Sequence, residues 1–231
     1  MQLKQREIFD PADAYDAIAG RYDDFYRRRI DRAENRFVHY LMPSGGSLLD
    51  LACGTGLVPR EIEPLVEPRN YLGVDASAGM IEQARRHRPD LEFDYQDIDF
   101  LDVGSRLFDR AVLLFGAFSY LRKPLGALRR IRRHVVENGE VLIMAYGEGH
   151  VAKPGYCLAN HPEVYRHYYT RNELRLFMFN AGFKDVRTFG WRRWPDETMT
   201  RLPVPLVPAL WVEHQLVRDD DCYFIVARGR A

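Results

Sequence analysis

The sequence predicts an α/β fold in which one mostly parallel sheet of seven strands carries helices on both of its faces. Short apolar runs typical of buried strands alternate with helical patterns along most of the chain, as in a doubly wound, Rossmann-like sheet. The last two strand patterns, 183–189 and 222–228, are joined without a clear crossover helix, which indicates that the last strand is antiparallel. Helical patterns before the first strand predict an N-terminal helical cap.

The composition is that of one globular domain. With 231 residues, 46% of them apolar and 29% charged, the chain can bury a proper core. Its 33 basic and 33 acidic residues cancel, so no overall field directs it to nucleic acid or to a membrane. Almost all the basic residues are arginines, which we interpret as the mark of a GC-rich bacterial genome.

The cysteines and the chain start bear on the cellular compartment. The three cysteines are scattered and form no C-x-x-C pair, so neither a zinc site nor a disulfide framework is indicated. No apolar run approaches the roughly 20 residues that a membrane span needs, and the first residues are not typical of a signal peptide. We therefore expect a cytoplasmic protein without a metal site.

Two helical patterns precede the first strand. Asp10 and Pro11 are typical of an N-cap and a first helical position, and apolar side chains then recur at helical spacing as far as residue 26. A second pattern covers 30–41 and ends before Pro43. The tyrosines of the first pattern can be interpreted simply as a stripe that packs on the core.

The stretch Ser47–Arg60 predicts a ligand-binding turn. A buried strand is broken by Gly54 and Gly56 and is followed by a helical pattern, and glycine lets the backbone approach a ligand closely. The fingerprint of NAD-binding folds needs a third glycine, but Pro59 stands at that place. Asp50, just before the turn, can accept a hydrogen bond from a cationic amino group, which S-adenosylmethionine (SAM) has.

At these residues the sequence resembles the class I SAM-dependent methyltransferases, whose first motif is a strand that ends in an acid, followed by x-x-G-x-G. Leu48–Gly56 matches this motif, and the resemblance implies cofactor contacts at Ala52 and at the two glycines. It extends over essentially the whole chain and implies a single domain, 1–231. Within it we expect a helical cap (1–43), a cofactor-binding half (44–146) and a substrate-side half (147–231).

The second strand pattern, 70–75, ends in Asp75 about 20 residues after the glycine turn, which is the spacing of a ribose-binding carboxylate. Its carboxylate can accept from both ribose hydroxyls; the alternative is a second helix cap. Ser77 predicts the N-cap of the next helix. Gly73–Met80 resembles the family's second motif, which implies that Ala76 and Met80 also contact the cofactor.

A third strand pattern, 91–95, is followed by an acid and an apolar residue. In the family, such an acid accepts from the adenine amine and the next residue packs on the ring, which implies these roles for Asp97 and Ile98. Asp94 and Asp99 are nearby acids that could take the first role.

A fourth strand pattern, 108–115, ends at the carboxyl edge of the sheet, where ligands bind in open α/β sheets. The pattern here resembles small-molecule methyltransferases, including those that methylate amino sugars. This resemblance implies that Leu114 and Phe115 approach the methionine end of SAM and that Tyr120 faces the acceptor. The leading segment is similar to a Tyr-Asp…Tyr-Asp segment of the family, which implies that Tyr22 touches the cofactor and makes Tyr15 a further candidate.

The second half of the chain continues the alternation. A helix begins at Pro124, and we expect the arginines on its outer face to be solvated rather than to bind phosphate. The Asn138-Gly139 turn precedes a strand at 140–146, and Thr170–Glu173 predicts a capping box whose helix stops at Gly182.

Methyl transfer from a sulfonium is an in-line displacement, so the protein mainly orients the reactants and excludes water. A base is needed only where the acceptor must lose a proton. His150, just past the fifth strand, is the best placed candidate, with His161 and His167 as alternatives, and Tyr120 could orient the acceptor. No sequence feature separates O-, N- and C-methylation.

The aromatic residues of 151–169 and 191–211 suggest an apolar or aromatic acceptor pocket. We therefore expect an enzyme that methylates a small molecule, as a monomer or a homodimer, without nucleic-acid or membrane partners. An RNA methyltransferase usually adds a basic surface or an RNA-binding module, and neither is evident. A non-catalytic SAM-binding module is the other alternative, although such a module has no need to keep the acids Asp50, Asp75 and Asp97 and the glycines Gly54 and Gly56.

Overall fold

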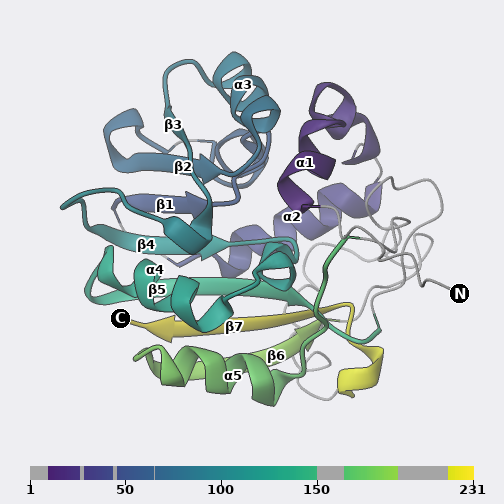
Figure 1. The fold of residues 1–231 in the computed structure, drawn as a ribbon, viewed down its shortest axis with the longest axis vertical. Coiled ribbons are helices and arrows are strands. Elements are labelled where there is room, and N and C mark those ends of the chain that lie inside the picture. Colours follow the sequence, from purple (N-terminus) through teal and green to yellow (C-terminus); the bar gives the residue numbers. More distant parts are fainter. Residues whose placement is uncertain (1–9, 27–28, 44–45, 65, 150–163, 192–217) are drawn as a thin grey trace, which may run out of the picture.

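A computed structural model describes residues 10–26, 29–43, 46–64, 66–149, 164–191 and 218–231. Its centre is a seven-stranded sheet in the order β3-β2-β1-β4-β5-β7-β6 (Figure 1). The strands are β1 Leu48–Leu51, β2 Tyr71–Asp75, β3 Glu92–Tyr95, β4 Phe108–Leu113, β5 Val135–Tyr146, β6 Lys184–Trp191 and β7 Phe224–Arg230. β1 pairs in parallel with β2 and β4, whereas β7 is antiparallel to both β5 and β6. The predicted sheet and its antiparallel last strand are confirmed.

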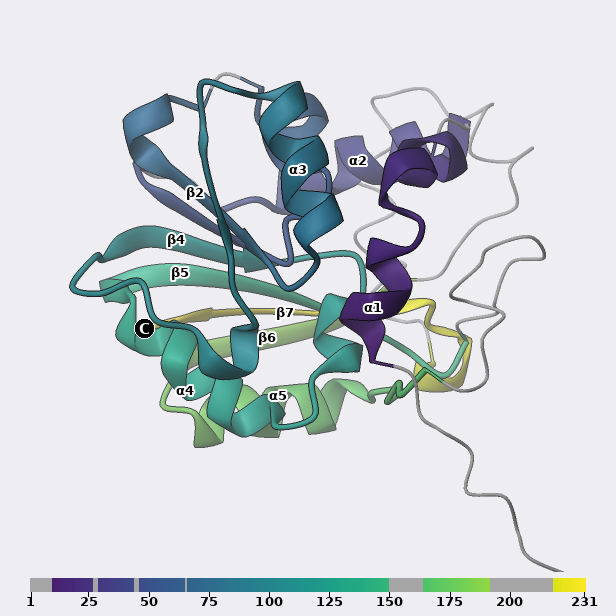
Figure 2. The same cartoon turned by 45° about the horizontal axis from the view of Figure 1, so that its top comes forward.

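Helices cover both faces of the sheet, as predicted (Figure 2). They are α1 Pro11–Asp16, α2 Arg29–Leu41, α3 Ala78–His87, α4 Pro124–Arg133 and α5 Arg171–Asn180. One core cluster joins the sheet to α4 and α5, and a second joins it to α2 and α3. Side chains of a strand alternate between the two faces, so Leu49 and Leu51 enter the first cluster and Leu48 the second.

The predicted helix ends are confirmed by their hydrogen bonds. The Asp10 side chain accepts from the Ala12 amide at the start of α1, and the Ser77 side chain accepts from the Met80 amide at the start of α3. Thr170 forms the capping box that begins α5. These local signals depend on a few adjacent residues, which is why the sequence reveals them.

Two helical predictions differ from the structure. α1 ends at Asp16, and residues 19–26 form a 3₁₀ helix that contains Gly20, a residue that weakens an α-helix. After the glycine turn only the short π-helical segment Val58–Ile62 forms. Pro59 lies in the first turn, where proline is tolerated, but Pro64 just beyond the segment disfavours helical backbone at Glu63 and so stops a longer α-helix.

The region around β5 also differs from expectation. The strand begins at Val135, and Asn138, with φ of +63°, lies inside it instead of in a preceding turn. The pairing register with β4 shifts there, so the predicted turn is an irregularity within a longer strand. On α4, the arginines are not simply solvated, because Arg130 and Arg132 donate to the backbone carbonyls of Asp99 and Gly182.

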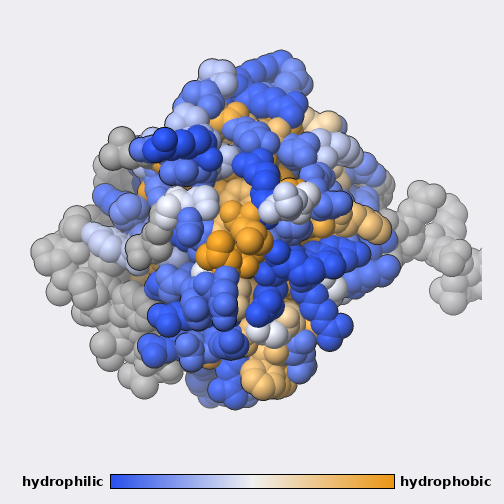
Figure 3. Space-filling model, turned by 90° about the vertical axis from the view of Figure 1, so that its left-hand side faces the viewer, coloured by the Kyte–Doolittle hydropathy of each residue, from blue (hydrophilic) through white to orange (hydrophobic). Residues whose placement is uncertain are grey.

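The amino ends of the parallel strands form a face covered mainly by hydrophilic side chains around a small hydrophobic cluster (Figure 3). The opposite, carboxyl edge carries α1 and the start of α3 (Figures 1 and 2). Among the described residues, no helix is both long enough and apolar enough to cross a membrane.

Candidate functional site

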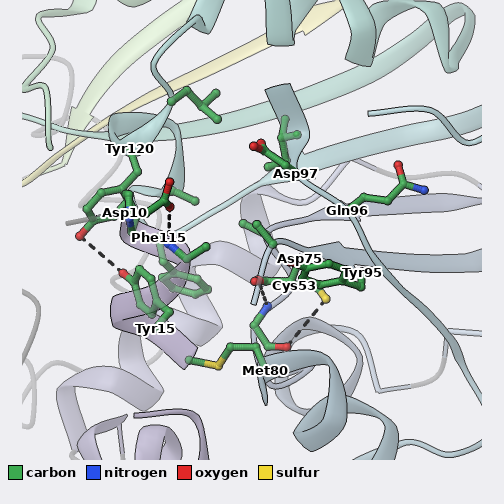
Figure 4. A pocket seen from close by; sticks show the side chains of 18 of the residues that line it. Asp10, Tyr15, Cys53, Asp75, Met80, Tyr95, Gln96, Asp97, Phe115 and Tyr120 are labelled. Carbon is green, nitrogen blue, oxygen red and sulfur yellow. Dashed lines mark hydrogen bonds between the residues drawn. The ribbon is translucent and has the colours of Figure 1, made fainter. Parts of the chain in front are cut away.

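A pocket of about 520 Å³ lies at the carboxyl ends of β1, β2, β3 and β4 and is bordered by α1 (Figure 4). Ligands of open α/β sheets bind at this edge. Ten of the twelve predicted cofactor residues line it: Tyr22, Ala52, Gly54, Asp75, Ala76, Met80, Asp97, Ile98, Leu114 and Phe115. Tyr120, predicted to face the acceptor, lines it as well.

Asp75 ends β2, and its side chain connects the loop after β1 with the loop after β2. One carboxylate oxygen accepts from the Gly54 amide and the other from the Ser77 amide, each at 2.9 Å. Burial raises the pKa of this carboxyl group, and backbone hydrogen bonds from Ser77, Gly54 and Ala76 act against that shift. Each oxygen keeps a lone pair that can accept from a ligand hydroxyl. Ser77 caps α3, so Asp75 is not needed as the side-chain cap that was the alternative.

Strained backbone is found in the pocket wall. Ala52, after β1, and Phe115, after β4, both have φ of +51°, a region that residues with a Cβ rarely adopt. Gly54, whose amide donates to Asp75, has φ of +54° as well. Non-glycine residues in this conformation persist where the surrounding structure fixes them, and they cluster at functional sites.

The two predicted residues outside the pocket wall are Asp50 and Gly56. The Asp50 side chain is only 2% exposed and accepts a hydrogen bond of 2.7 Å from the Tyr71 hydroxyl. Because strand side chains alternate, Asp50 points to the face that carries α2 and α3, below the glycine turn. Gly56 has φ of +79°, which favours glycine, and a Cβ there would make an ordinary contact of 3.4 Å with Phe93. The sequence gives no signal for the Tyr71 partner.

At the far end of the pocket the structure separates the candidate acids. Asp97 is exposed and lines the pocket beside the buried Ile98, and Asp99 lines it as well. Asp94 does not, and its carboxylate accepts from the Gln96 side chain at 2.7 Å. The exposed ring of Tyr95 is a lining residue that sequence reasoning missed, because it ends an edge strand without any motif.

We expect Asp97→Ala to weaken cofactor binding by about tenfold, since one exposed charged hydrogen bond is lost. Asp94→Ala is the matched control, because Asp94 is an acid three residues earlier in the chain that does not line the pocket. It should leave the affinity unchanged. Calorimetry with S-adenosylhomocysteine, the product that SAM becomes when it loses its methyl group, measures the affinity of both variants. Equal losses in the two variants would remove Asp97 from the site.

Tyrosines form the wall on the α1 side. The hydroxyl oxygens of Tyr15 and Tyr120 are 3.5 Å apart, and their rings meet edge to face (Figure 4). Burial raises the pKa of Tyr15 and of Tyr22, which keeps both phenols neutral. The same rings also pack against Met80 and Ile18, so the core-packing interpretation of the stripe holds beside the pocket contact.

Of the predicted histidines, only His167 is among the described residues, and it does not line this pocket. His150 and His161 lie outside those residues. His167 is described and exposed, with its Nε2 4.0 Å from the Glu173 carboxylate at the start of α5. In the described ranges, no group of three His, Cys, Asp or Glu side chains could hold a metal ion.

Comparisons with known proteins show the family and the fold of this chain. A family model described as a methyltransferase domain matches residues 22–188. The chain is 30% identical over 157 residues to a dTDP-3-amino-3,6-dideoxy-alpha-D-glucopyranose N,N-dimethyltransferase of Streptomyces fradiae, covering 66% of this chain and 60% of that protein. It is 29% identical over 135 residues to a demethylmenaquinone methyltransferase of Chlamydia pneumoniae, covering 56% and 58%. The chain thus spans about three-fifths of the length of these curated relatives.

The fold agrees with a solved structure of a SAM-dependent methyltransferase from Thermotoga maritima, with a TM-score of 0.68 at 17% identity. The match covers 95% of this chain and 98% of that one. At this identity the likeness concerns the fold, whereas the family model covers most of the described pocket residues. The chain belongs to the class I SAM-dependent methyltransferase family, whose cofactor is SAM.

Proposed function

We propose that this protein transfers a methyl group from SAM to an oxygen, nitrogen or carbon atom of a small molecule. The proposal is carried by the convergence of residues from separate stretches on one pocket. Residues predicted from the motifs at 48–56, 73–80 and 97–98 line it together with the ends of β1, β2 and β4. Such convergence at the carboxyl edge is what a nucleoside-binding α/β sheet requires.

The residues present fit SAM. Asp75 keeps free lone pairs for hydroxyl donors, and Ile98 and Met80 supply buried apolar surface for the base. Acidic side chains outnumber basic ones in the lining, where Arg122 is the basic residue and the acids are Asp10, Asp13, Asp75, Asp97 and Asp99. This charge balance favours a cationic ligand such as a sulfonium.

In methyl transfer from SAM the protein mainly has to orient the methyl donor and the acceptor. When bound, SAM supplies a methyl group already activated by its sulfonium. Tyr15 and Tyr120 present hydroxyls that can position an acceptor by hydrogen bonding. The cap segment 10–26 borders the pocket and reduces the access of water. We keep His150 as the proposed base for acceptors that must lose a proton.

A small-molecule acceptor is supported by the two curated relatives, whose names state activity on a sugar nucleotide and on demethylmenaquinone. Aromatic rings on the α1 side, among them Tyr15, Tyr22 and Tyr120, favour an apolar or aromatic acceptor. We propose a single domain, 1–231, acting as a monomer or a homodimer in the cytoplasm.

The test is transfer of a labelled methyl group from SAM to a metabolite extract, with total RNA as a second acceptor pool. We expect label in a small molecule and none in RNA, and a large loss of that label in Tyr120→Ala. Label in RNA would replace the proposal with the RNA alternative. SAM binding without any transfer would favour the non-catalytic alternative.

A further inference from the structure

Two Tyr-Asp pairs in the cap segment divide their side chains between two tasks. Tyr15 and Tyr22 line the pocket. The residue after each, Asp16 and Asp23, does not line it and instead bonds to another part of the fold. In each pair the tyrosine thus forms part of the pocket wall, and the aspartate anchors the cap segment, meaning that it bonds the segment to another part of the fold.

Asp16 anchors the cap segment to the start of α3. Its Oδ1 accepts from the Ser77 hydroxyl at 2.9 Å and from the Gly79 amide at 2.6 Å. The cap segment and α3 lie close together here, since a Cβ at Gly79 would be 3.0 Å from both the Ala19 Cβ and Asp16 Oδ1. A carboxylate that accepts two bonds at a helix start is a charge-assisted contact.

Asp23 anchors the same segment to the glycine turn. Its Oδ1 accepts from the Thr55 hydroxyl at 2.6 Å, and its Oδ2 accepts from Arg60 Nη1 at 2.6 Å. His87 Nε2 lies 3.8 Å from that second oxygen. Thr55 stands between the two glycines of the turn and is 1% exposed, so losing Asp23 takes the acceptor from a buried hydroxyl.

The two anchors meet at the proposed cofactor carboxylate. Thr55 follows Gly54, whose amide donates to Asp75, and Asp75 accepts in turn from the amide of Ser77. Asp16 and Asp23 thus bond to the two loops that Asp75 joins. The cap can move away from the pocket only when these contacts break.

We propose that Asp16 and Asp23 are positioning residues that hold the cap segment, and with it Tyr15 and Tyr22, closed over the pocket and so set the residence time of the cofactor. The anchoring itself rests on the hydrogen bonds above. The effect on the cofactor rests on the proposed function.

The experiment uses the full chain and two readouts, hydrogen exchange of peptides from 10–26 without ligand and the dissociation rate of S-adenosylhomocysteine. We expect Asp16→Ala and Asp23→Ala each to speed exchange in 10–26 and to raise the dissociation rate by about tenfold. Exchange in β1, β4 and β5 should stay as in the wild type, which separates opening of the cap from unfolding.

Three further variants sharpen the test. Asp16→Asn keeps an oxygen that accepts from Ser77 and Gly79 and should restore most of the slow dissociation. Gly79→Leu retains the Asp16 side chain but crowds both its carboxylate and Ala19 from the α3 side, and it should behave like Asp16→Ala. Asp90→Ala removes an exposed partner of Arg88 elsewhere on the molecule and should change neither readout.

The outcomes separate this inference from the proposed function. If exchange in 10–26 is unchanged in Asp16→Ala, Asp23→Ala and Gly79→Leu, the anchoring role is refuted. If exchange rises but dissociation of the bound nucleoside does not, the cap does not set residence time. If the wild type does not bind the nucleoside at all, the proposed function fails, and the exchange data alone decide the anchoring.

Discussion

Asp75→Ala is expected to weaken the binding of S-adenosylhomocysteine by at least about 100-fold while the sheet stays folded. Asp75 accepts from Gly54 and Ser77 and keeps lone pairs for a ligand. The variant therefore loses charge-assisted bonds to the ligand and also the link that fixes the two loops. The loss should far exceed that of Asp97→Ala, whose carboxylate is exposed.

Calorimetry measures the affinity, and thermal unfolding shows whether the fold is intact. Asp75→Glu is the matched control, because it keeps the charge but extends the side chain by one methylene. It should bind more weakly than the wild type, since the longer side chain cannot reach Gly54 and Ser77 in the same geometry. A folded Asp75→Ala protein with wild-type affinity would mean that the nucleoside does not lie in this pocket.

The sheet was predictable because its signals are local. Most strands contain a short apolar run, β3 alternates polar and apolar residues, and the starts of α1, α3 and α5 are marked by Asp10, Ser77 and Thr170. The motifs also placed ten residues on one pocket, because parallel strands bring their carboxyl ends to one edge. Because the order of the strands in the sheet is set by the fold, residues that are far apart in the sequence come together at that edge.

The rest depends on contacts between distant residues. Nothing near Asp50 in the chain reveals that the Tyr71 hydroxyl will bond to it, and nothing near Asp23 reveals Thr55. The helix expected after the glycine turn follows the apolar period, but Pro64 stops it after a short segment. Alternation within β1 also decided that Asp50 would face the core and not the pocket.

Asp50 should make the stability of the protein depend on pH. Burial raises the pKa of this carboxyl group to about 7 from 3.8, the Tyr71 hydrogen bond lowers it, and Asp75 and Glu63 raise it further. A raised folded-state pKa means that the folded chain binds the proton more tightly than the unfolded chain. The resulting stabilisation is complete below about pH 4, falls as the pH rises and is lost above about pH 7.

Between pH 5 and pH 8 the free energy of unfolding of the wild type should therefore fall by roughly 3 kcal/mol more than that of Asp50→Asn. Asparagine does not titrate, and its carbonyl oxygen can still accept from Tyr71. Urea unfolding of both proteins at several pH values measures the difference, in which the titration of all other groups largely cancels. Tyr71→Phe is the companion variant and should lose more stability at pH 8 than at pH 5, because it removes the donor to the charged form. Parallel pH profiles for the wild type and Asp50→Asn would contradict the buried titration.

The same group also tests whether the cofactor amine acts on Asp50, although Asp50 does not line the pocket. A bound ammonium nearby would favour the charged carboxylate and lower its pKa, so binding near pH 7 would release a fraction of a proton. Calorimetry in buffers of different ionisation enthalpy measures that release, and we expect it in the wild type and not in Asp50→Asn. Equal proton release in the two proteins would show that the ammonium does not act on Asp50. The motif acid would then serve the fold through Tyr71, and the carboxylate that recognises the cofactor would be Asp75.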